Sequence, residues 1–328
     1  MNQKVIFNDY IDERVMIKKH GNTEFCNPNM LEINPTVGCQ FQCQYCNAYT
    51  QEKEDKFDEV IVYKNYPKYL EQYILDNREE VKNKFFYFSP KVDAFQQVLI
   101  DTGILKQILE IFLKYQVKYF ILTKGKLLPP DIAELLVKSR EINQIIISCA
   151  MPNEIVRQKL EVCAPTIEER LALAKFATDN GIVTTAIFAP ILPIKNLDFV
   201  KDYIVKYLAM GITHFRVDFT EVSRESLGKI VKILPEYKEE LEKIYYDKDA
   251  VQTKWNIPFS DPPKFITRYW PSLTYMRQVC CNMESFATSI NPKATISICN
   301  SISIMRMLGN VNKKANECGF CCIGARFK

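Results

Sequence analysis

Short apolar runs alternate with amphipathic stretches between residues 31 and 219 of this chain. Short apolar runs predict buried strands, and apolar positions that recur every three to four residues predict helices with one buried face. The predicted strands are Leu31–Thr36, Phe85–Phe88, Lys118–Leu122, Gln144–Ser148, Val183–Phe188 and His214–Phe219.

Helical patterns fill the intervals between these strands. A strand–helix alternation is what a parallel sheet requires, because each crossover returns the chain to the same edge. Six such units fall short of the eight of a closed barrel, so the pattern predicts an α/β fold, a partial (β/α)6 TIM-type barrel. The predicted helices are Tyr66–Lys82, Gly103–Tyr115, Pro130–Ser139, Ile167–Asn180 and Leu197–Met210.

The pattern changes after Glu221. A charged helix is predicted over Arg224–Tyr245, and the segment after it, which contains Trp255, Trp270 and four prolines, is interpreted as irregular. We expect domain boundaries near residues 222 and 275. They divide the chain into an N-terminal extension (1–30), the barrel (31–222), a helix and linker (223–274) and a small cysteine-rich C-terminal domain (275–328).

The composition, 47% hydrophobic and 25% charged over 328 residues, is that of a globular protein that buries a core without disulfides. It nevertheless includes 12 cysteines and only 2 histidines. The chain shows neither a signal-like N-terminal run nor an apolar stretch of the ~20 residues that span a bilayer, so we expect a cytoplasmic protein with no membrane partner. Clustered cysteines in a reducing compartment favour metal or redox chemistry. The net charge of +4 leaves a nucleic-acid partner open without favouring it.

Three of the cysteines, Cys39, Cys43 and Cys46, form C-x3-C-x2-C directly after the first predicted strand. Three thiolates on one loop can converge on one metal ion or cluster. A structural zinc site needs four ligands, and neither a histidine nor a fourth cysteine stands at ordinary finger spacing. A cluster with one open iron is therefore favoured, and a zinc knuckle completed by the remote Cys26 is the alternative.

This motif, with Tyr45 just before the last cysteine, resembles the signature of the radical S-adenosylmethionine (SAM) enzymes. The resemblance implies a [4Fe–4S] cluster on Cys39, Cys43 and Cys46, whose open iron binds the amino and carboxylate groups of SAM. It also implies that the reduced cluster cleaves SAM to a 5′-deoxyadenosyl radical, which abstracts a substrate hydrogen. A flavodoxin- or ferredoxin-type protein is the expected electron donor.

Over residues 30–270 the chain is most similar to the spore photoproduct lyase-like branch of that family. The similarity implies that Ser89 and Asp93 of YFSPKVDAFQ lie beside the SAM amino group, that Lys124 of ILTKGK binds its carboxylate, and that Ser148 of IIISCA binds the ribose or the carboxylate. Ser148 could instead simply end a strand, and Lys124 could be a solvated turn residue. Arg170 is as well explained by an ion pair on a helix surface.

The chain also departs from that branch. The lyase carries a cysteine hydrogen donor at the end of strand two, whereas this chain has Phe88–Ser89 there, which counts against photoproduct repair. Cys149 and Cys163 are candidate hydrogen donors. The alternative for both is a small buried hydrophobic side chain.

Six cysteines fall in the last 49 residues. The segment SINPKATISIC between Cys281 and Cys299 has the turn and alternation of a hairpin, and Cys318 and Cys321 add a C-x2-C pair. The pattern resembles the shortened SPASM, or twitch, domains, and implies a second, auxiliary [4Fe–4S] cluster on Cys281, Cys299, Cys318 and Cys321. A zinc ribbon is the alternative, and the doublets Cys280–Cys281 and Cys321–Cys322 leave the ligating member open.

The expected function is that of a radical SAM enzyme acting on a peptide or protein, since SPASM-type tails are frequent in enzymes that modify ribosomally made peptides. A nucleic-acid lyase or repair enzyme is the alternative within the class, and a small-metabolite enzyme is the third. The alternative from another class is a non-catalytic zinc or iron–sulfur binding module.

Overall fold

The computed structural model describes residues 3–19, 30–46, 58–256 and 265–298. The chain forms two compact units. Unit 1 comprises Met1–Phe41, Lys56–Ile147 and Glu168–Thr184, and unit 2 comprises Gln42–Asp55, Ser148–Ile167 and Thr185–Lys328.

Unit 1 contains parallel strands in the order β3 (Met30–Ile33), β6 (Phe85–Phe88), β7 (Lys118–Thr123) and β8 (Asn143–Ser148). Strand β2 (Lys18–Lys19) pairs antiparallel with β3. The predicted strand Leu31–Thr36 is interrupted at Pro35, and its last part is β4 (Thr36–Val37). Strand β4 belongs to a second sheet with β5 (Glu59–Tyr63) and β1 (Lys4–Asn8), which the sequence pattern did not predict.

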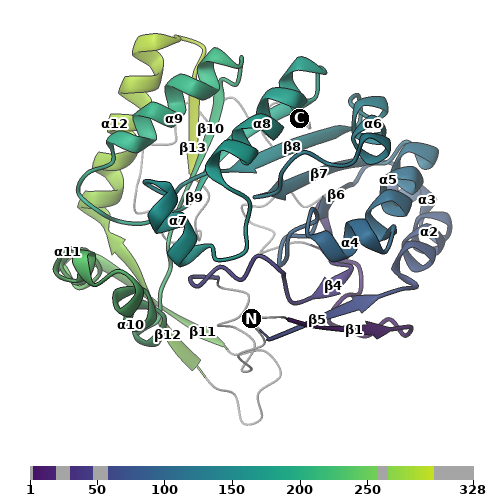
Figure 1. The fold of residues 1–328 in the computed structure, drawn as a ribbon, viewed down its shortest axis with the longest axis horizontal. Coiled ribbons are helices and arrows are strands. Elements are labelled where there is room, and N and C mark those ends of the chain that lie inside the picture. Colours follow the sequence, from purple (N-terminus) through teal and green to yellow (C-terminus); the bar gives the residue numbers. More distant parts are fainter. Residues whose placement is uncertain (1–2, 20–29, 47–57, 257–264, 299–328) are drawn as a thin grey trace. The chain divides into compact units, whose positions relative to one another are not determined.

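Helices α2 (Tyr66–Asp76), α5 (Ile104–Tyr115) and α6 (Pro130–Lys138) lie in a row in unit 1 (Figure 1). Helix α5 turns its buried residues toward the sheet, where the Phe112 ring stacks on Tyr119 of β7 at 4.6 Å. The predicted helix Tyr66–Lys82 ends early, because the Asn77 side chain donates a hydrogen bond back to the Tyr73 carbonyl at 2.9 Å. The remaining helices of this unit are α3 (Arg78–Val81), α4 (Gln97–Asp101) and most of α8 (Ile167–Asp179).

Unit 2 contains parallel pairs of β10 (His214–Phe219) with β9 (Val183–Ile191) and with β13 (Thr295–Ile298). Helices α9 (Asp198–Ala209) and α12 (Leu273–Ile290) lie side by side against one face of these strands (Figure 1). On that face the Phe188 ring packs on Phe215 at 6.1 Å and on Tyr203 at 6.4 Å. A short helix, α7 (Glu154–Leu160), precedes α8.

The chain between β10 and α12 is more regular than predicted. The single helix expected over Arg224–Tyr245 is divided into α10 (Arg224–Ile233), the 3-10 turn η2 (Pro235–Tyr237) and α11 (Lys238–Tyr245), because Pro235 cannot donate the helical hydrogen bond. The prediction of irregular chain around the tryptophans is wrong. Strands β11 (Ala250–Asn256) and β12 (Phe265–Ser272) form an antiparallel ribbon there.

The predicted hairpin between Cys281 and Cys299 is also wrong. Both Cys280 and Cys281 lie in α12, whose buried positions recur at helical spacing, and β13 then pairs in parallel with β10. The described part of the predicted domain 275–328 thus continues the sheet of unit 2. Cys280 is buried and Cys281 exposed, while Cys26, Cys299, Cys318, Cys321 and Cys322 lie outside the described residues.

The predicted α/β class with parallel strands is confirmed. Among the residues that the structure describes, every helix is too short or too polar to cross a bilayer.

Candidate functional site

The first part of the cysteine loop belongs to unit 1. Gly38 adopts a φ of +87°, and a Cβ atom there would lie 2.4 Å from the Glu59 carbonyl oxygen, so this position requires glycine. Cys39 follows it and is buried. The backbone N–H of Gln40 donates to the Gln96 side chain at 3.2 Å, which holds the chain beyond the cysteine.

The second part of the loop belongs to unit 2. The Tyr45 hydroxyl donates a short hydrogen bond to the fully buried carboxylate of Glu161, and the backbone of Cys43 forms a β-bridge with the same residue. The N–H of Cys46 donates to the Cys43 carbonyl at 3.0 Å and closes a tight turn. Residues that face Glu161 therefore hold the last two cysteines in place.

The donor set of this loop fits an iron–sulfur cluster chemically, because thiolates are the ligands that such clusters take. Cys43 is buried and Cys46 is half-buried. Within the described ranges, no three Cys, His, Asp or Glu side chains lie close enough together to hold a metal ion. Ligation by Cys39, Cys43 and Cys46 thus rests on the motif.

Asp93, predicted to lie beside the SAM amino group, holds two loops of unit 1 together. Its carboxylate accepts hydrogen bonds from the Thr123 hydroxyl at 2.7 Å and from the backbone N–H groups of Lys124 and Phe95 at 2.8 and 2.9 Å. Burial raises the pKa of Asp93 above its usual value. These bonds fix the position of Lys124, the predicted carboxylate ligand, directly after β7.

Ser89 is the orphaned polar group of unit 1. It is fully buried at the end of β6 and has a left-handed backbone with a φ of +63°. Its N–H donates to the Ile33 carbonyl at 2.7 Å, but its hydroxyl has no hydrogen-bond partner among the described residues. A buried hydroxyl of this kind fits a polar group of a bound cofactor such as SAM.

The other predicted site residues belong to unit 2. The Ser148 hydroxyl donates to the Ala189 carbonyl of β9 at 2.9 Å, and the Cys149 N–H donates to the Ile187 carbonyl at 3.1 Å. Both residues therefore lie against β9. Cys149 is fully buried, whereas Cys163 is exposed, so the two candidate hydrogen donors have opposite environments.

Two charged residues with structural importance were missed in the sequence. Arg170 is fully buried, which corrects the interpretation of an ion pair on a helix surface. Its spacing from Leu173, Ala174 and Ala177, which are buried on the same face of α8, is the signal that could have revealed it. Glu161 could not have been found in this way, because only the fold brings it to Tyr45.

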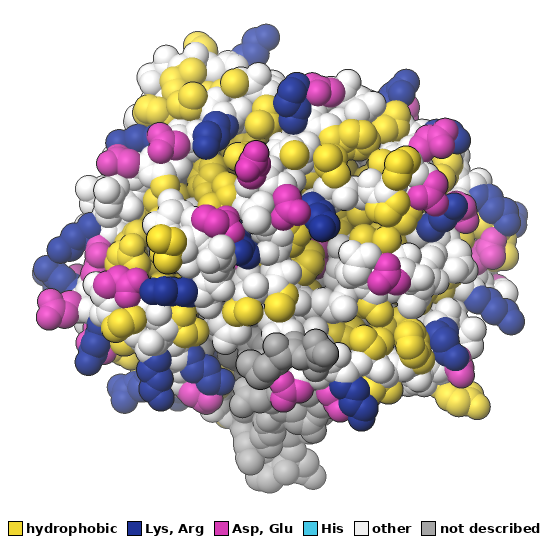
Figure 2. Space-filling model, in the orientation of Figure 1, with side chains coloured by type: hydrophobic (Ala, Val, Ile, Leu, Met, Phe, Trp, Pro, Cys, Tyr) yellow, Lys and Arg dark blue, Asp and Glu magenta, His cyan; other side chains and the backbone are white. Residues whose placement is uncertain are grey.

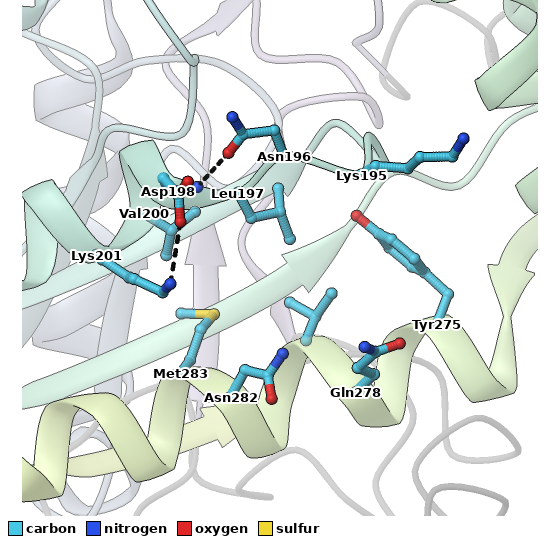
Figure 3. Close-up of a pocket in the computed structure, with 11 residues that line it drawn as sticks. Lys195, Asn196, Leu197, Asp198, Val200, Lys201, Tyr275, Gln278, Asn282 and Met283 are labelled. Atoms are coloured by element: carbon cyan, nitrogen blue, oxygen red, sulfur yellow. Dashed lines mark hydrogen bonds and ion pairs between the residues drawn. The ribbon is translucent and has the colours of Figure 1, made fainter.

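A cavity of about 530 Å³ lies between the start of α9 and the first half of α12 (Figure 3). Asp198 spans one wall, where its N–H donates to the Asn196 side chain at 2.9 Å and its carboxylate pairs with Lys201 at 3.0 Å. The Tyr275 hydroxyl at its edge donates to the Ile194 carbonyl at 2.9 Å. The residues that line this cavity include none of the predicted site residues.

Parallel α/β strands with a three-cysteine loop after the first of them define an α/β protein of the iron–sulfur type. The family model of the radical SAM superfamily matches residues 33–204, and the chain belongs to this superfamily. Membership implies SAM and a [4Fe–4S] cluster as cofactors, and it supports an enzyme.

Known relatives support the fold further. An uncharacterised protein of Methanocaldococcus jannaschii is 27% identical over 165 residues, which span 49% of this chain and 60% of that protein. Spore photoproduct lyase complexed with dinucleoside spore photoproduct is similar in structure, with a TM-score of 0.61 at 13% identity over 90% of this chain and 82% of the lyase chain. SuiB of Streptococcus suis bound to SAM has a TM-score of 0.46 at 14% identity over 66% of this chain and 48% of its own. The similarity to the lyase is one of fold, and it agrees with the predicted partial barrel.

Proposed function

We propose that this protein cleaves SAM reductively and uses the resulting radical to abstract a hydrogen atom from its substrate. The observation that carries this proposal is the C-x3-C-x2-C loop, which lies inside the matched family range of residues 33–204. When bound, the [4Fe–4S] cluster supplies one-electron reduction of SAM to a 5′-deoxyadenosyl radical.

The residues of this chain would have distinct tasks. The thiolates of Cys39, Cys43 and Cys46 hold the cluster, and Tyr45 keeps the last two in position through its bond to Glu161. The buried hydroxyl of Ser89 supports a contact with a polar group of SAM. The tasks of two further residues follow the family resemblance, namely Lys124 for the SAM carboxylate and Ser148 for its ribose or carboxylate.

We infer a peptide or protein substrate. The support is the pattern of Cys281, Cys299, Cys318 and Cys321, which resembles the twitch domains and would hold an auxiliary cluster. On the face drawn in Figure 2, Lys and Arg side chains are interspersed with Asp and Glu. Together with the net charge of +4, this distribution offers little electrostatic preference for a polyanion. A flavodoxin- or ferredoxin-type protein would deliver the electron.

Anaerobic reconstitution tests the radical chemistry. With both clusters loaded, the protein should bind about eight irons per chain and, after reduction, convert SAM to 5′-deoxyadenosine. The Cys43→Ala variant should lose about four of these irons and the SAM cleavage, because one thiolate ligand is removed. Stoichiometric zinc with no SAM cleavage by the unaltered protein would contradict the proposal and favour a binding module.

Salt-dependent binding tests the substrate class. A peptide enzyme should bind DNA and RNA weakly at moderate salt, with a shallow salt dependence. Tight binding that falls steeply as salt rises would instead indicate a nucleic-acid substrate, which is the alternative. The presence of Phe88–Ser89 where the lyase branch has a cysteine donor argues against that alternative.

A further inference from the structure

The β11–β12 ribbon is fastened to unit 2 at the carboxyl end of β10. Just past that end, the N–H of Val222 donates to the Tyr269 carbonyl at 3.0 Å, and the N–H of Tyr269 donates to the Val222 carbonyl at 2.7 Å. Enzymes with parallel α/β sheets bind their substrates at the carboxyl ends of the strands. The part of β12 around Tyr269 therefore lies at the edge where substrate contacts are expected.

The two neighbours of Tyr269 share one face of the ribbon. Tyr269 itself points toward α10 and α11, where its hydroxyl accepts a hydrogen bond from Arg224 at 3.2 Å and its ring packs on Tyr246 at 5.5 Å. Successive side chains of a strand point to opposite faces, so Arg268 and Trp270 both point away from those helices. They are almost completely buried, with exposures of 1% and 4%.

A single carboxylate lies beside this pair. Thr253 is opposite Arg268 in the strand register, which puts the two on the same face, and its hydroxyl contacts the Glu221 carboxylate at 3.5 Å. Burial lowers the pKa of the Arg268 guanidinium, and the negative charge of Glu221 opposes this shift. Glu221 therefore holds the guanidinium by electrostatic attraction and limits the net charge of the site.

The indole N–H of Trp270 is the second observation that indicates a ligand. It is buried and has no hydrogen-bond acceptor among the residues that the structure describes. Buried donors without an acceptor are uncommon in native proteins, and an indole N–H can only donate. The face thus presents one indole donor and a guanidinium fork, a set that suits an oxygen acceptor.

We propose that Arg268 and Trp270 bind a carboxylate group of the substrate at the carboxyl edge of the unit 2 sheet. A carboxylate can accept two parallel hydrogen bonds from a guanidinium, and it carries the single charge that this site balances better than a phosphate dianion. The inference rests on the proposed radical function and names the chemical group that its substrate, a peptide, presents. Arg268 and Trp270 would position that group.

Fluorine NMR of the reconstituted full-length protein labelled with 5-fluorotryptophan tests this inference. The chain has 2 tryptophans, and the Trp255→Phe variant identifies the Trp270 signal. N-acetyl-glutamic acid amide should shift that signal saturably, whereas N-acetyl-glutamine amide and inorganic phosphate should shift it at least tenfold more weakly. Arg268→Gln should weaken the response to the glutamic acid probe at least tenfold.

Two further variants separate binding from folding. Trp270→Phe keeps an aromatic ring but removes the N–H, so we expect severalfold weaker binding of the glutamic acid probe, measured by calorimetry. Arg224→Gln removes an exposed arginine from the opposite face of the ribbon and should leave binding of the probe unchanged.

The outcomes distinguish this inference from the proposed function. Equal binding of the glutamine probe, stronger binding of phosphate, or no response to any probe would overturn the carboxylate site, even if the protein makes 5′-deoxyadenosine. Failure to cleave SAM would contradict the proposed function without altering the probe titration. Loss of probe binding in Arg268→Gln with SAM cleavage retained is the result that supports both.

Discussion

The two units of this protein bury polar groups near the carboxyl ends of their strands in different ways. In unit 1 the Asp93 carboxylate accepts three hydrogen bonds from its own unit and joins the loop after β6 to the end of β7. In unit 2, Arg268 and Trp270 present donors, and the indole N–H has no acceptor among the described residues. A buried group whose hydrogen bonds are satisfied internally holds a loop, whereas one that is unsatisfied indicates a ligand.

The comparison also explains how the cysteine loop is supported. Its first part is fixed by the close approach of Gly38 to Glu59 in unit 1. Its second part is fixed by the hydrogen bond between Tyr45 and Glu161 in unit 2. Backbone fit is the main support in one unit and a buried side-chain hydrogen bond in the other.

The largest expected effect comes from replacing Gly38. In Gly38→Ala the Cβ atom would meet the Glu59 carbonyl, and alanine is disfavoured at a φ of +87°, so we expect a loss of about 3 kcal/mol in the free energy of unfolding. Urea denaturation measures this loss. In the control, Gly211→Ala, the φ is +85° but no atom lies within 4 Å, so the loss should be about 1 kcal/mol. Equal losses would show that backbone fit at Gly38 is not the support of unit 1.

A pH effect of similar size is expected from His214 in unit 2. Its ring contacts the hydroxyls of Thr295 at 2.7 Å and Ser297 at 3.2 Å, and burial, with Arg216 nearby, lowers its pKa from 6.5 to about 4. Between these values the unfolded chain binds a proton that the folded protein does not bind. His214 should therefore cost up to about 3 kcal/mol of stability as the pH falls from 6.5 to 4.

Urea denaturation as a function of pH measures this slope. In His214→Asn the part of the slope between pH 6.5 and 4 that belongs to the histidine should disappear, while the acid sensitivity of the carboxyl groups remains. An unchanged slope would mean that His214 is accessible to protons in the folded protein.

A smaller effect is expected from Tyr45→Phe. The variant removes the donor to the buried Glu161 carboxylate, and the loss of a hydrogen bond to a charged group should lower the free energy of unfolding by about 2 kcal/mol. Tyr203→Phe is the matched control, because that hydroxyl donates to the neutral Met151 carbonyl at 2.9 Å and should cost about 1 kcal/mol. If Tyr45→Phe cost no more than the control, the bond to Glu161 would not be a main support of the loop.

The smallest expected effect is a gain. Ser89→Gly relieves a left-handed backbone and removes a buried unpartnered hydroxyl, so the free energy of unfolding should rise by about 1 kcal/mol while SAM binding weakens severalfold. Gln116→Gly, at a φ of +53° at the end of α5, should raise stability without altering SAM binding. Calorimetric titration with SAM distinguishes the two, and unchanged SAM affinity in Ser89→Gly would remove Ser89 from the cofactor site.

Strongly periodic segments were predictable from the sequence. Strands β6 and β10 have the predicted bounds, because continuous or alternating apolar residues define a strand without help from distant parts of the chain. The β11–β12 ribbon was not predictable, because Arg268 and four nearby prolines argue locally against a strand. Pairing with the distant Val222 and burial of both faces outweigh that local preference.

The hairpin expected after Cys281 failed for a related reason. The residues that follow it can alternate as a strand or form the last turns of a helix, and short apolar patterns do not distinguish the two. Packing decides between them, because the buried face of α12 lies against α9 and β13 completes a parallel pair with β10.

By itself, the sequence determined the chemistry that this protein can hold: three cysteines at a spacing that suits an iron–sulfur cluster, within a strand–helix pattern that predicts an α/β fold. These properties depend on residue type and on near neighbours in the chain. The tertiary structure alone decided which polar groups are satisfied. Asp93 is enclosed by donors from another loop, whereas the Ser89 hydroxyl and the Trp270 N–H are buried without a partner among the described residues. Hydrogen-bond satisfaction depends on groups that are distant in the chain, so only the folded protein separates framework residues from candidate ligand-binding residues.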